Sequence, residues 1–381
     1  MKIAASPTNG LSAAQGGSEA AGGLTAAAGA PTAATVRQNL SMMLLALLLA
    51  AGLALSGCSA QNQPAADAAS AASASSATEV PSADPVAVKV LALKGPTAMG
   101  LVDFFSAVDA GEVTSNDFSY SIVAAPDEVT AAIAKGDADI AAVPANVAAV
   151  LYNNTQGGVK ALTINTLGVL YLLEDGDSVT SVEQLRGKTI YASGKGATPE
   201  YALNYILEKN QLVPGTDVTI EWLPEHSAVV AALASNPNGV AMLPQPFVTT
   251  VQVQNANLRV ALDLNQEWAR IADGSALVTG ATIVRSEFAK EHPEAVADFL
   301  ARYQESVEFV NSDVDAAATL VGSYDIVTAE VAKAALPKCN IVFIAGPEMQ
   351  AVLGGYLQVL YEQNPKTVGG TLPDDDFYYK Q

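Results

Sequence analysis

The chain has 381 residues, of which 50% are hydrophobic and 15% are charged, and its formal net charge at pH 7 is −20. This length is enough for a leader and two domains with sizeable cores. The acidic balance argues against a nucleic-acid partner and against docking on an anionic membrane surface, since both require basic patches. Only two cysteines and two histidines occur, in none of the common zinc-binding patterns, so we expect no metal and no cofactor.

The chain starts with the pattern of an export signal. Arg37 precedes an uncharged apolar run of eighteen residues, 40–57, that leads into Leu55-Ser56-Gly57-Cys58. An apolar core followed by small residues is typical of a cleaved signal, and the last four residues resemble a bacterial lipobox. We therefore expect a signal over residues 1–57 and lipidation at Cys58. The alternative is a transmembrane helix, but the run lies at the lower limit for spanning a bilayer and no basic cluster follows it.

Residues 58–85 consist mainly of Ala, Ser, Asp and Pro. Such a segment cannot bury enough apolar surface to offset the entropy cost of ordering it. It is predicted to be a disordered tether that holds the following domains off the membrane.

Units of one strand and one helix follow the tether. Residues 86–93, 118–124 and 140–143 are apolar runs that predict buried strands. A helix beginning at Pro96 follows the first run, and a helix over 126–135 follows the second. Alternation of this kind predicts an α/β fold with a mainly parallel sheet that is covered on both faces.

A second domain is predicted where the polarity rises. After strand-like runs at 159–167 and 169–173, Glu174-Asp175-Gly176-Asp177 marks the expected crossover. The second domain, residues 178–280, is predicted to contain four strands, near 189–192, 218–223, 240–243 and 258–264.

A strand at 281–285 is predicted to return the chain to the first domain, which therefore comprises residues 86–177 and 281–381. Helices from Pro293 onward are expected to pack on it. Because the chain crosses between the domains twice, a cleft is expected at the hinge.

Four short sequences resemble a known family in their order along the chain. They are VKVLALKGPT (88–97), GDADIAAVPAN (136–146), LRGKTI (185–190) and MLPQPF (242–247). Together with the lipobox, they resemble the type II solute-binding proteins of ABC importers, especially the branch for nitrate, sulfonates, taurine and thiamine-pyrimidine precursors. The resemblance implies a two-lobed type II periplasmic-binding-protein fold, with two mainly parallel sheets joined by a two-strand hinge. It also implies that the lobes close over a small molecule and deliver it to a permease.

The predicted ligand site consists of loops at strand carboxyl ends, where open α/β sheets bind ligands. The candidates are Lys94, Gly95, Pro96, Thr97, Asn146, Ser193, Gly194, Lys195, Gly196, Thr198, Gln245 and Phe247. The glycine-rich loop lacks the spacing of a nucleotide cradle, but its amides and hydroxyls suit a carboxylate, a sulfonate or a polar ring edge. Lys94 and Lys195, one from each lobe, would favour an anion. Gln245 stands where many relatives have glutamate, which removes a charge.

Several further residues have two readings. Trp268 and Tyr171 could stack on a ligand ring, and His226 begins a helix beyond a strand end; each could instead serve packing. Cys339 is expected to be a buried hydrophobe. No Ser-His-Asp order, nucleophile elbow or close carboxylate pair is recognisable, so no catalytic residues and no enzyme activity are expected.

The sequence therefore predicts a monomeric, lipid-anchored extracytoplasmic solute-binding protein. It would capture a small polar or anionic organic molecule and pass it to the permease subunits of an ABC importer. The alternatives are an enzyme on the same fold, namely a pyrimidine-precursor synthase or a chorismate-dehydratase-like protein, and an adhesive lipoprotein without a deep polar cleft. The export signal argues against the enzymes, which belong in the cytoplasm.

Overall fold

The computed structural model describes residues 85–236, 238–272 and 274–380. The predicted signal over 1–57, the lipidation site Cys58 and all of the predicted tether except Pro85 lie outside these residues. None of the described helices is long and apolar enough to cross a membrane.

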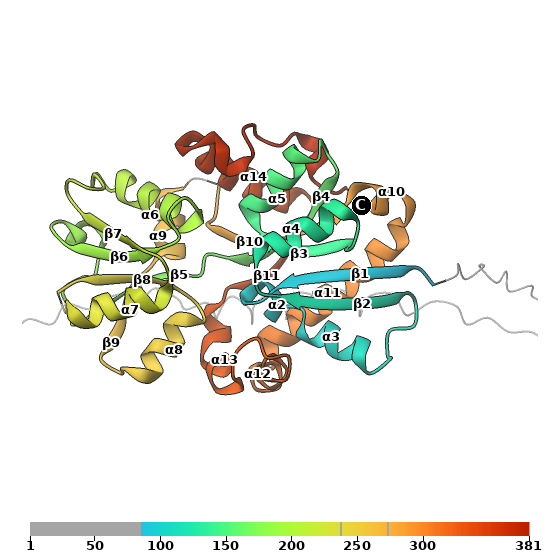
Figure 1. The fold of residues 1–381 in the computed structure, drawn as a ribbon, viewed down its shortest axis with the longest axis horizontal. Coiled ribbons are helices and arrows are strands. Elements are labelled where there is room, and N and C mark those ends of the chain that lie inside the picture. Colours follow the sequence, from blue (N-terminus) through green and yellow to red (C-terminus); the bar gives the residue numbers. More distant parts are fainter. Residues whose placement is uncertain (1–84, 237, 273, 381) are drawn as a thin grey trace, which may run out of the picture. The chain divides into compact units, whose positions relative to one another are not determined.

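The first sheet has six strands in the order β11-β4-β10-β3-β1-β2 (Figure 1). Strand β1 pairs in parallel with β2 and β3, whereas β10 is antiparallel to β3 and β4, and β11 is antiparallel to β4. Four strands therefore point one way and two point the other. The bounds are β1 (Ala87–Leu93), β2 (Asp117–Val123), β3 (Ile140–Pro144), β4 (Val159–Leu167), β10 (Val278–Arg285) and β11 (Ile341–Ala345).

The second sheet has five strands in the order β7-β6-β8-β5-β9. Strand β6 pairs in parallel with β7 and β8, and β5 lies antiparallel between β8 and β9. The predicted α/β class with two sheets of mostly codirectional strands is thus confirmed. The bounds are β5 (Leu170–Asp175), β6 (Thr189–Ser193), β7 (Thr219–Leu223), β8 (Val240–Pro244) and β9 (Leu258–Asp263).

Helices cover both faces of each sheet (Figure 1). One face of the first sheet carries α2 (Pro96–Met99), α3 (Val102–Asp109), α10 (Ser286–Glu291), α11 (Pro293–Ser312), α12 (Val314–Ser323) and α13 (Ala329–Ala335). Its other face carries α4 (Pro126–Lys135), α5 (Ala145–Asn154) and α14 (Gly346–Gln363). The second sheet is covered by α6 (Thr198–Lys209) and α9 (Leu264–Ile271) on one face and by α7 (His226–Ser235) and α8 (Phe247–Gln254) on the other. We call each sheet with its helices a lobe.

Burial on both faces explains why β1 is an almost continuous apolar run. Val90 packs into the cluster that contains Phe104 and Phe299, whose rings lie edge to face with centroids 5.5 Å apart. Leu91 points to the opposite face and packs into the cluster of α4. A strand that is covered by helices on both faces needs apolar residues at consecutive positions.

The chain changes sheets at Gly168, earlier than predicted. Strand β4 ends in the first sheet at Leu167 and β5 begins in the second sheet at Leu170, so the expected crossover at residues 174–177 is wrong. The polar residues there end β5 and do not mark the change of sheet. A Cβ atom at Gly168 would lie 2.8 Å from the side chain of Leu277, which belongs to the returning segment. A side chain at residue 168 would therefore require Leu277 to shift.

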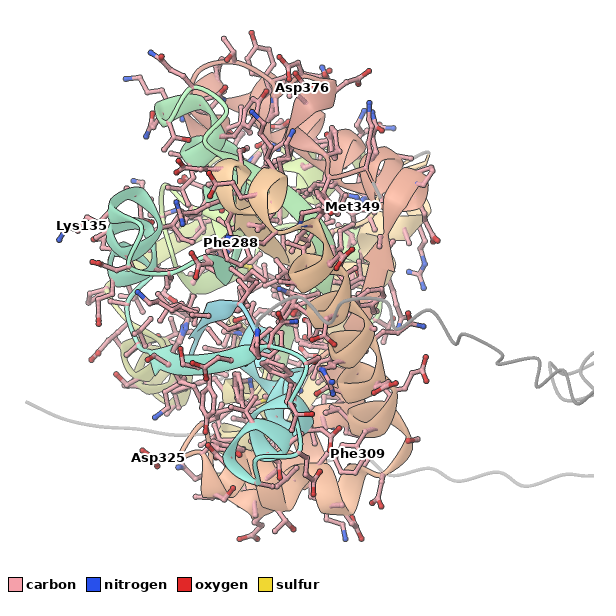
Figure 2. All side chains as sticks on the ribbon, turned by 90° about the vertical axis from the view of Figure 1, so that its right-hand side faces the viewer. Lys135, Phe288, Phe309, Asp325, Met349 and Asp376 are labelled. Atoms are coloured by element: carbon pink, nitrogen blue, oxygen red, sulfur yellow. The ribbon has the colours of Figure 1, made fainter. Side chains whose placement is uncertain are left out.

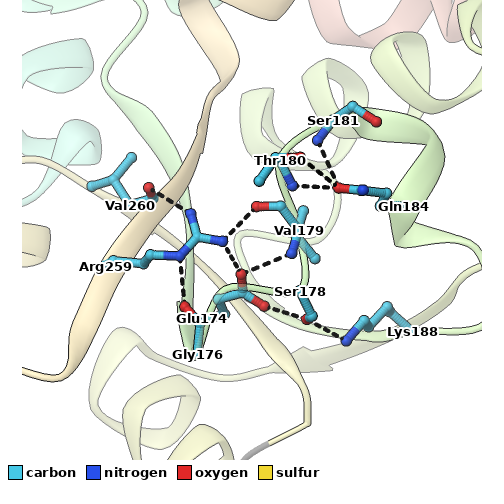
Figure 3. A network of polar contacts seen from close by, with 10 residues as sticks. All are labelled: Glu174, Gly176, Ser178, Val179, Thr180, Ser181, Gln184, Lys188, Arg259 and Val260. Atoms are coloured by element: carbon cyan, nitrogen blue, oxygen red, sulfur yellow. Dashed lines mark hydrogen bonds and ion pairs between the residues drawn. The ribbon is translucent and has the colours of Figure 1, made fainter. Parts of the chain in front are cut away.

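A buried ion pair fixes the edge strand of the second sheet (Figure 3). Glu174, at the end of β5, is 3% exposed and contacts the guanidinium of Arg259 in β9. Its other bonds come from the Ser178 hydroxyl at 2.6 Å and the Val179 amide at 2.8 Å. Arg259 also donates to the carbonyls of Gly176 at 2.6 Å and Val179 at 2.7 Å. These bonds hold the loop after β5 onto β9.

Candidate functional site

A cavity of about 370 Å³ lies between the two sheets and is lined by residues from both lobes. The loops after β1, β3 and β6 contribute to it, together with the start of α7 and the segment between β4 and β5. Because β1 and β3 are parallel neighbours, as are β6 and β8, their carboxyl ends meet at one edge of each sheet. The two edges face each other across the cavity.

Most of the cavity wall is apolar. Leu93, Val147, Leu170 and Met242 line it from four different elements, and several prolines add to the wall. Leu170 and Met242 are both less than one-tenth exposed and belong to the packed sheets. Polar groups are therefore few, which is usual for a site that binds a small molecule.

One pair of polar side chains lies on the second-lobe wall. The Ser193 hydroxyl, at the end of β6, is 2.7 Å from Nδ1 of His226, the first residue of α7. The imidazole also packs against the ring of Phe247, with centroids 5.2 Å apart. Burial lowers the pKa of His226, and the charge of Glu225 opposes this only in part. The imidazole is therefore neutral near pH 7.

A chain of weaker bonds crosses between the lobes beside the cavity. Thr198, which begins α6, has its hydroxyl 3.5 Å from Oδ1 of Asn146, which belongs to the first lobe. The hydroxyl of Tyr356, on α14, lies 3.2 Å from the same Thr198 oxygen. Asn146 in turn donates from Nδ2 to the carbonyl of Thr367 at 3.4 Å. Thr198 and Asn146 both line the cavity, so the contact between lobes and the ligand site share residues.

The loop after β1 supplies a threonine and a lysine. The Thr97 hydroxyl donates to the carbonyl of Leu93 at 2.8 Å, so its proton is already used in a bond to the protein's own backbone. The side chain of Lys94 is 40% exposed, and its Nζ lies 3.5 Å from the carboxylate of Asp325. That aspartate projects fully into solvent (Figure 2). Lys94 thus places its charge at the rim of the cavity.

Similar solved structures were found, although no protein-family model matches the sequence and no curated protein is similar to it. An ABC transporter from Parabacteroides distasonis is 23% identical, with 78% of this chain and 100% of that chain covered and a TM-score of 0.63. The periplasmic aliphatic sulphonate binding protein SsuA from Escherichia coli is 16% identical, with 78% and 92% covered and a TM-score of 0.63. The alkanesulfonate-binding protein SsuA from Xanthomonas axonopodis pv. citri, bound to MOPS, is 14% identical, with 77% and 96% covered and a TM-score of 0.54.

The chain has the fold of these binding proteins. At such low identities the likeness establishes the fold alone, and it confirms the expected type II binding-protein architecture. The cavity lies where this fold brings its strand-end loops together.

Half of the predicted site residues line the cavity. Those that do are Lys94, Pro96, Thr97, Asn146, Ser193 and Thr198. Those that do not are Gly95, Gly194, Lys195, Gly196, Gln245 and Phe247. Lys195 is exposed at the tip of its loop, so the expected clamp of two opposed lysines is not formed in this conformation.

Gln245 serves the protein's own backbone. It is 1% exposed, and its Oε1 accepts from the Thr249 hydroxyl at 2.9 Å and from the Thr249 amide at 3.3 Å. These bonds fix the first turn of α8, while the buried Nε2 of Gln245 has no hydrogen-bond partner among the described residues.

The two aromatic candidates are packing residues. Trp268 is fully buried between the rings of Tyr205 and Tyr356, with centroids 4.5 and 5.7 Å away. Tyr171 is 5% exposed and donates from its hydroxyl to the carbonyl of Lys338 at 2.7 Å. Neither lines the cavity.

Sequence reasoning missed much of the apolar wall. Val147 directly follows the predicted Asn146, and Met242 precedes the predicted loop at Pro244. Val147 lies in the first turn of α5 and Met242 lies in β8, so the position of each beside a predicted loop was a usable signal. Thr279 lines the cavity from β10, on the segment that returns to the first lobe. No local sequence pattern predicts that this residue belongs to the site.

The Ser193 and His226 pair does not have the arrangement of a hydrolase site. A catalytic histidine contacts its serine through Nε2, while a carboxylate holds Nδ1. Here the serine occupies Nδ1, and among the described residues His226 donates no hydrogen bond to a carboxylate. The described part of the chain also contains no group of three or more His, Cys, Asp or Glu side chains that could hold a metal ion.

Proposed function

We propose that this protein is the extracytoplasmic solute-binding component of an ABC importer. One observation carries the proposal: a cavity of about 370 Å³ that is lined from both lobes by strand-end loops. Its lining combines apolar walls with a few polar groups, as expected for a site that holds a small molecule, and the ligand we propose is a small polar or anionic organic molecule. The solved binding proteins of the same fold support this reading.

The mechanism follows from the contacts between the two lobes. Contacts such as that between Thr198 and Asn146 join loops of different lobes, so a ligand that touches both loops stabilises the closed arrangement. The ligand then shifts an equilibrium between open and closed states by as much as its affinity for the two differs. The closed protein presents a ligand-specific surface to the permease subunits, and we propose that it acts as a monomer.

We propose that lipidation at Cys58 anchors the protein and that residues 58–85 act as the tether. In the native host, a Cys58→Ala variant should lose the lipid mass and partition into the soluble fraction. Unchanged mass and unchanged membrane partitioning would contradict the anchor.

An enzyme on the same fold is the second reading. The geometry of Ser193 and His226, in which Nδ1 faces the serine, disfavours acyl transfer. A binding role therefore accounts better for the site, and an adhesive role does not explain a cavity that is lined from both lobes.

The decisive experiment combines two measurements on the full-length protein. Small molecules released from protein purified from its native host are identified by mass spectrometry, and the identified compound is then titrated while small-angle scattering is recorded. We expect a raised thermal midpoint and a smaller radius of gyration on binding. Release of no compound, together with no thermal shift across sulfonates, nitrate, pyrimidines and carboxylates, would refute the proposal. Chemical turnover of the bound compound would favour the enzyme.

A further inference from the structure

We infer that the cavity selects an uncharged cyclic molecule, with an apolar ring and one amide-like polar edge that pairs with Ser193 and His226. This inference rests on the proposed solute-binding function and narrows its ligand from polar or anionic compounds to uncharged ones.

The first argument is the lack of a positive charge inside the cavity. Lys94 is the only lysine or arginine among the lining residues. Its ammonium lies at the rim, near Asp325 and partly in solvent. An anion deeper in the cavity would lose its hydration without gaining a buried partner, which is strongly unfavourable.

The second argument concerns the helix starts, which bind anions when their amides are free. Proline occupies the first turn of two helices that begin at the cavity, as Pro96 in α2 and Pro199 in α6. Each proline removes a backbone N–H that an anion would use and replaces it with an apolar ring. At these two helix starts the wall therefore presents hydrocarbon, whereas α5 and α7, which also begin at the cavity, have no proline in their first turn and keep their amides.

The third argument is the chemistry of the polar pair. The bond between Ser193 Oγ and His226 Nδ1 leaves the Nε2 atom of the imidazole available. The serine hydroxyl, which can both donate and accept, uses only one of these two functions in that bond. One neutral imidazole and one hydroxyl offer a donor and an acceptor side by side. The complement is a group that also carries one of each, such as a carboxamide or the edge of a pyrimidinone. The ring of such a ligand would lie against Leu170 and Met242.

The test compares ligands that differ only in charge, by calorimetric titration of the full-length protein at pH 7.5. The pairs are benzamide with benzoate, nicotinamide with nicotinate, and benzenesulfonamide with benzenesulfonate. In every pair that binds, we expect the uncharged member to bind at least about tenfold more tightly. An anion that binds as tightly as its uncharged partner, or more tightly, overturns the inference and leaves the solute-binding function standing. If no member of any pair binds and the native host supplies no bound compound, the inference and the proposed function both fail.

A variant tests the polar edge. Ser193→Ala should weaken binding of the uncharged member by about tenfold, because Nε2 loses its fixed orientation and a polar contact is lost. The matched control is Ser227→Ala, an exposed serine beside His226 that does not line the cavity, and it should leave affinity unchanged. Equal affinities of wild type and Ser193→Ala would overturn the assignment of the polar edge.

A pH series on the wild-type protein keeps the inference testable if Ser193→Ala fails to fold. The charged or titratable groups near His226 are Glu225 on its own helix and Lys94 across the cavity. Because burial lowers the pKa of His226, the imidazole is neutral at pH 7.5 and gains its proton only in more acidic solution. Affinity for an uncharged ligand should be constant at neutral pH and fall on acidification. A rise in affinity on acidification, as an anion would show, would contradict the inference.

Discussion

Replacing Arg259 with leucine should destabilise the second lobe by removing the partner of a buried carboxylate. Glu174 is 3% exposed and Arg259 is 33% exposed by side chain, so the pair is largely shielded from solvent. Loss of one partner from a buried pair costs about 3–5 kcal/mol. Glu174 would keep its bonds from Ser178 and Val179 (Figure 3), and water can reach the space left by the arginine. We therefore expect a loss of about 2–3 kcal/mol.

The assay is thermal unfolding followed by circular dichroism. At about 2–4 °C per kcal/mol for a chain of this order of size, the midpoint should fall by roughly 5–10 °C. The control is Lys333→Leu in the first lobe, whose side chain is 62% exposed and whose ammonium lies 2.8 Å from the carboxylate of Asp315, itself 71% exposed. An exposed pair contributes about 0.2–1 kcal/mol, so this midpoint should fall by no more than about 4 °C.

A second substitution separates charge from packing. Adding Glu174→Gln to Arg259→Leu removes the unpaired charge, and part of the lost stability should return. A midpoint for Arg259→Leu within about 2 °C of wild type would refute the reasoning, because it would mean that the carboxylate is adequately solvated without its partner.

Three further predictions concern the site and the core. Tyr356→Phe should weaken ligand binding about 2- to 12-fold, because it removes a hydrogen bond between the lobes. Tyr361→Phe on the same helix should have no effect, and equal titration curves for the two variants would contradict the role of that bond. Gly280→Ala should lower the midpoint of thermal unfolding, because the new Cβ would overlap Oδ1 of the buried Asn165 and lie 2.6 Å from Cγ2 of Thr97; an unchanged midpoint would contradict this overlap. Burial raises the pKa of the Cys339 thiol to about 12, so in a Cys58→Ala variant at pH 8 Ellman's reagent should modify Cys339 only after unfolding in guanidinium. Rapid modification of that variant in its native state would disprove the burial of Cys339.

The strand-end loops could be predicted from the sequence because local patterns indicate where they lie. An apolar run followed by glycine, proline and a helix start marks the loops of Lys94 and Ser193, and both line the cavity. The loop of Gln245 also follows an apolar run and has prolines before a helix start, yet its side chain bonds to Thr249. Local pattern gives the position of a loop along the chain, whereas the direction of each side chain depends on packing against the next helix.

The sequence by itself determined the alternation of strands and helices, the α/β class and the edge of each sheet at which a ligand can bind. The periodicity of apolar residues and the positions of turn-forming residues are local properties, so they can be recognised in the sequence. Only the tertiary structure decided that the chain changes sheets at Gly168, because that depends on the close approach of Leu277 from a distant segment. Likewise, the pairing of Ser193 with His226 and the rim position of Lys94 arise from contacts between elements far apart in sequence. Those contacts, which no local pattern encodes, set the polarity of the cavity.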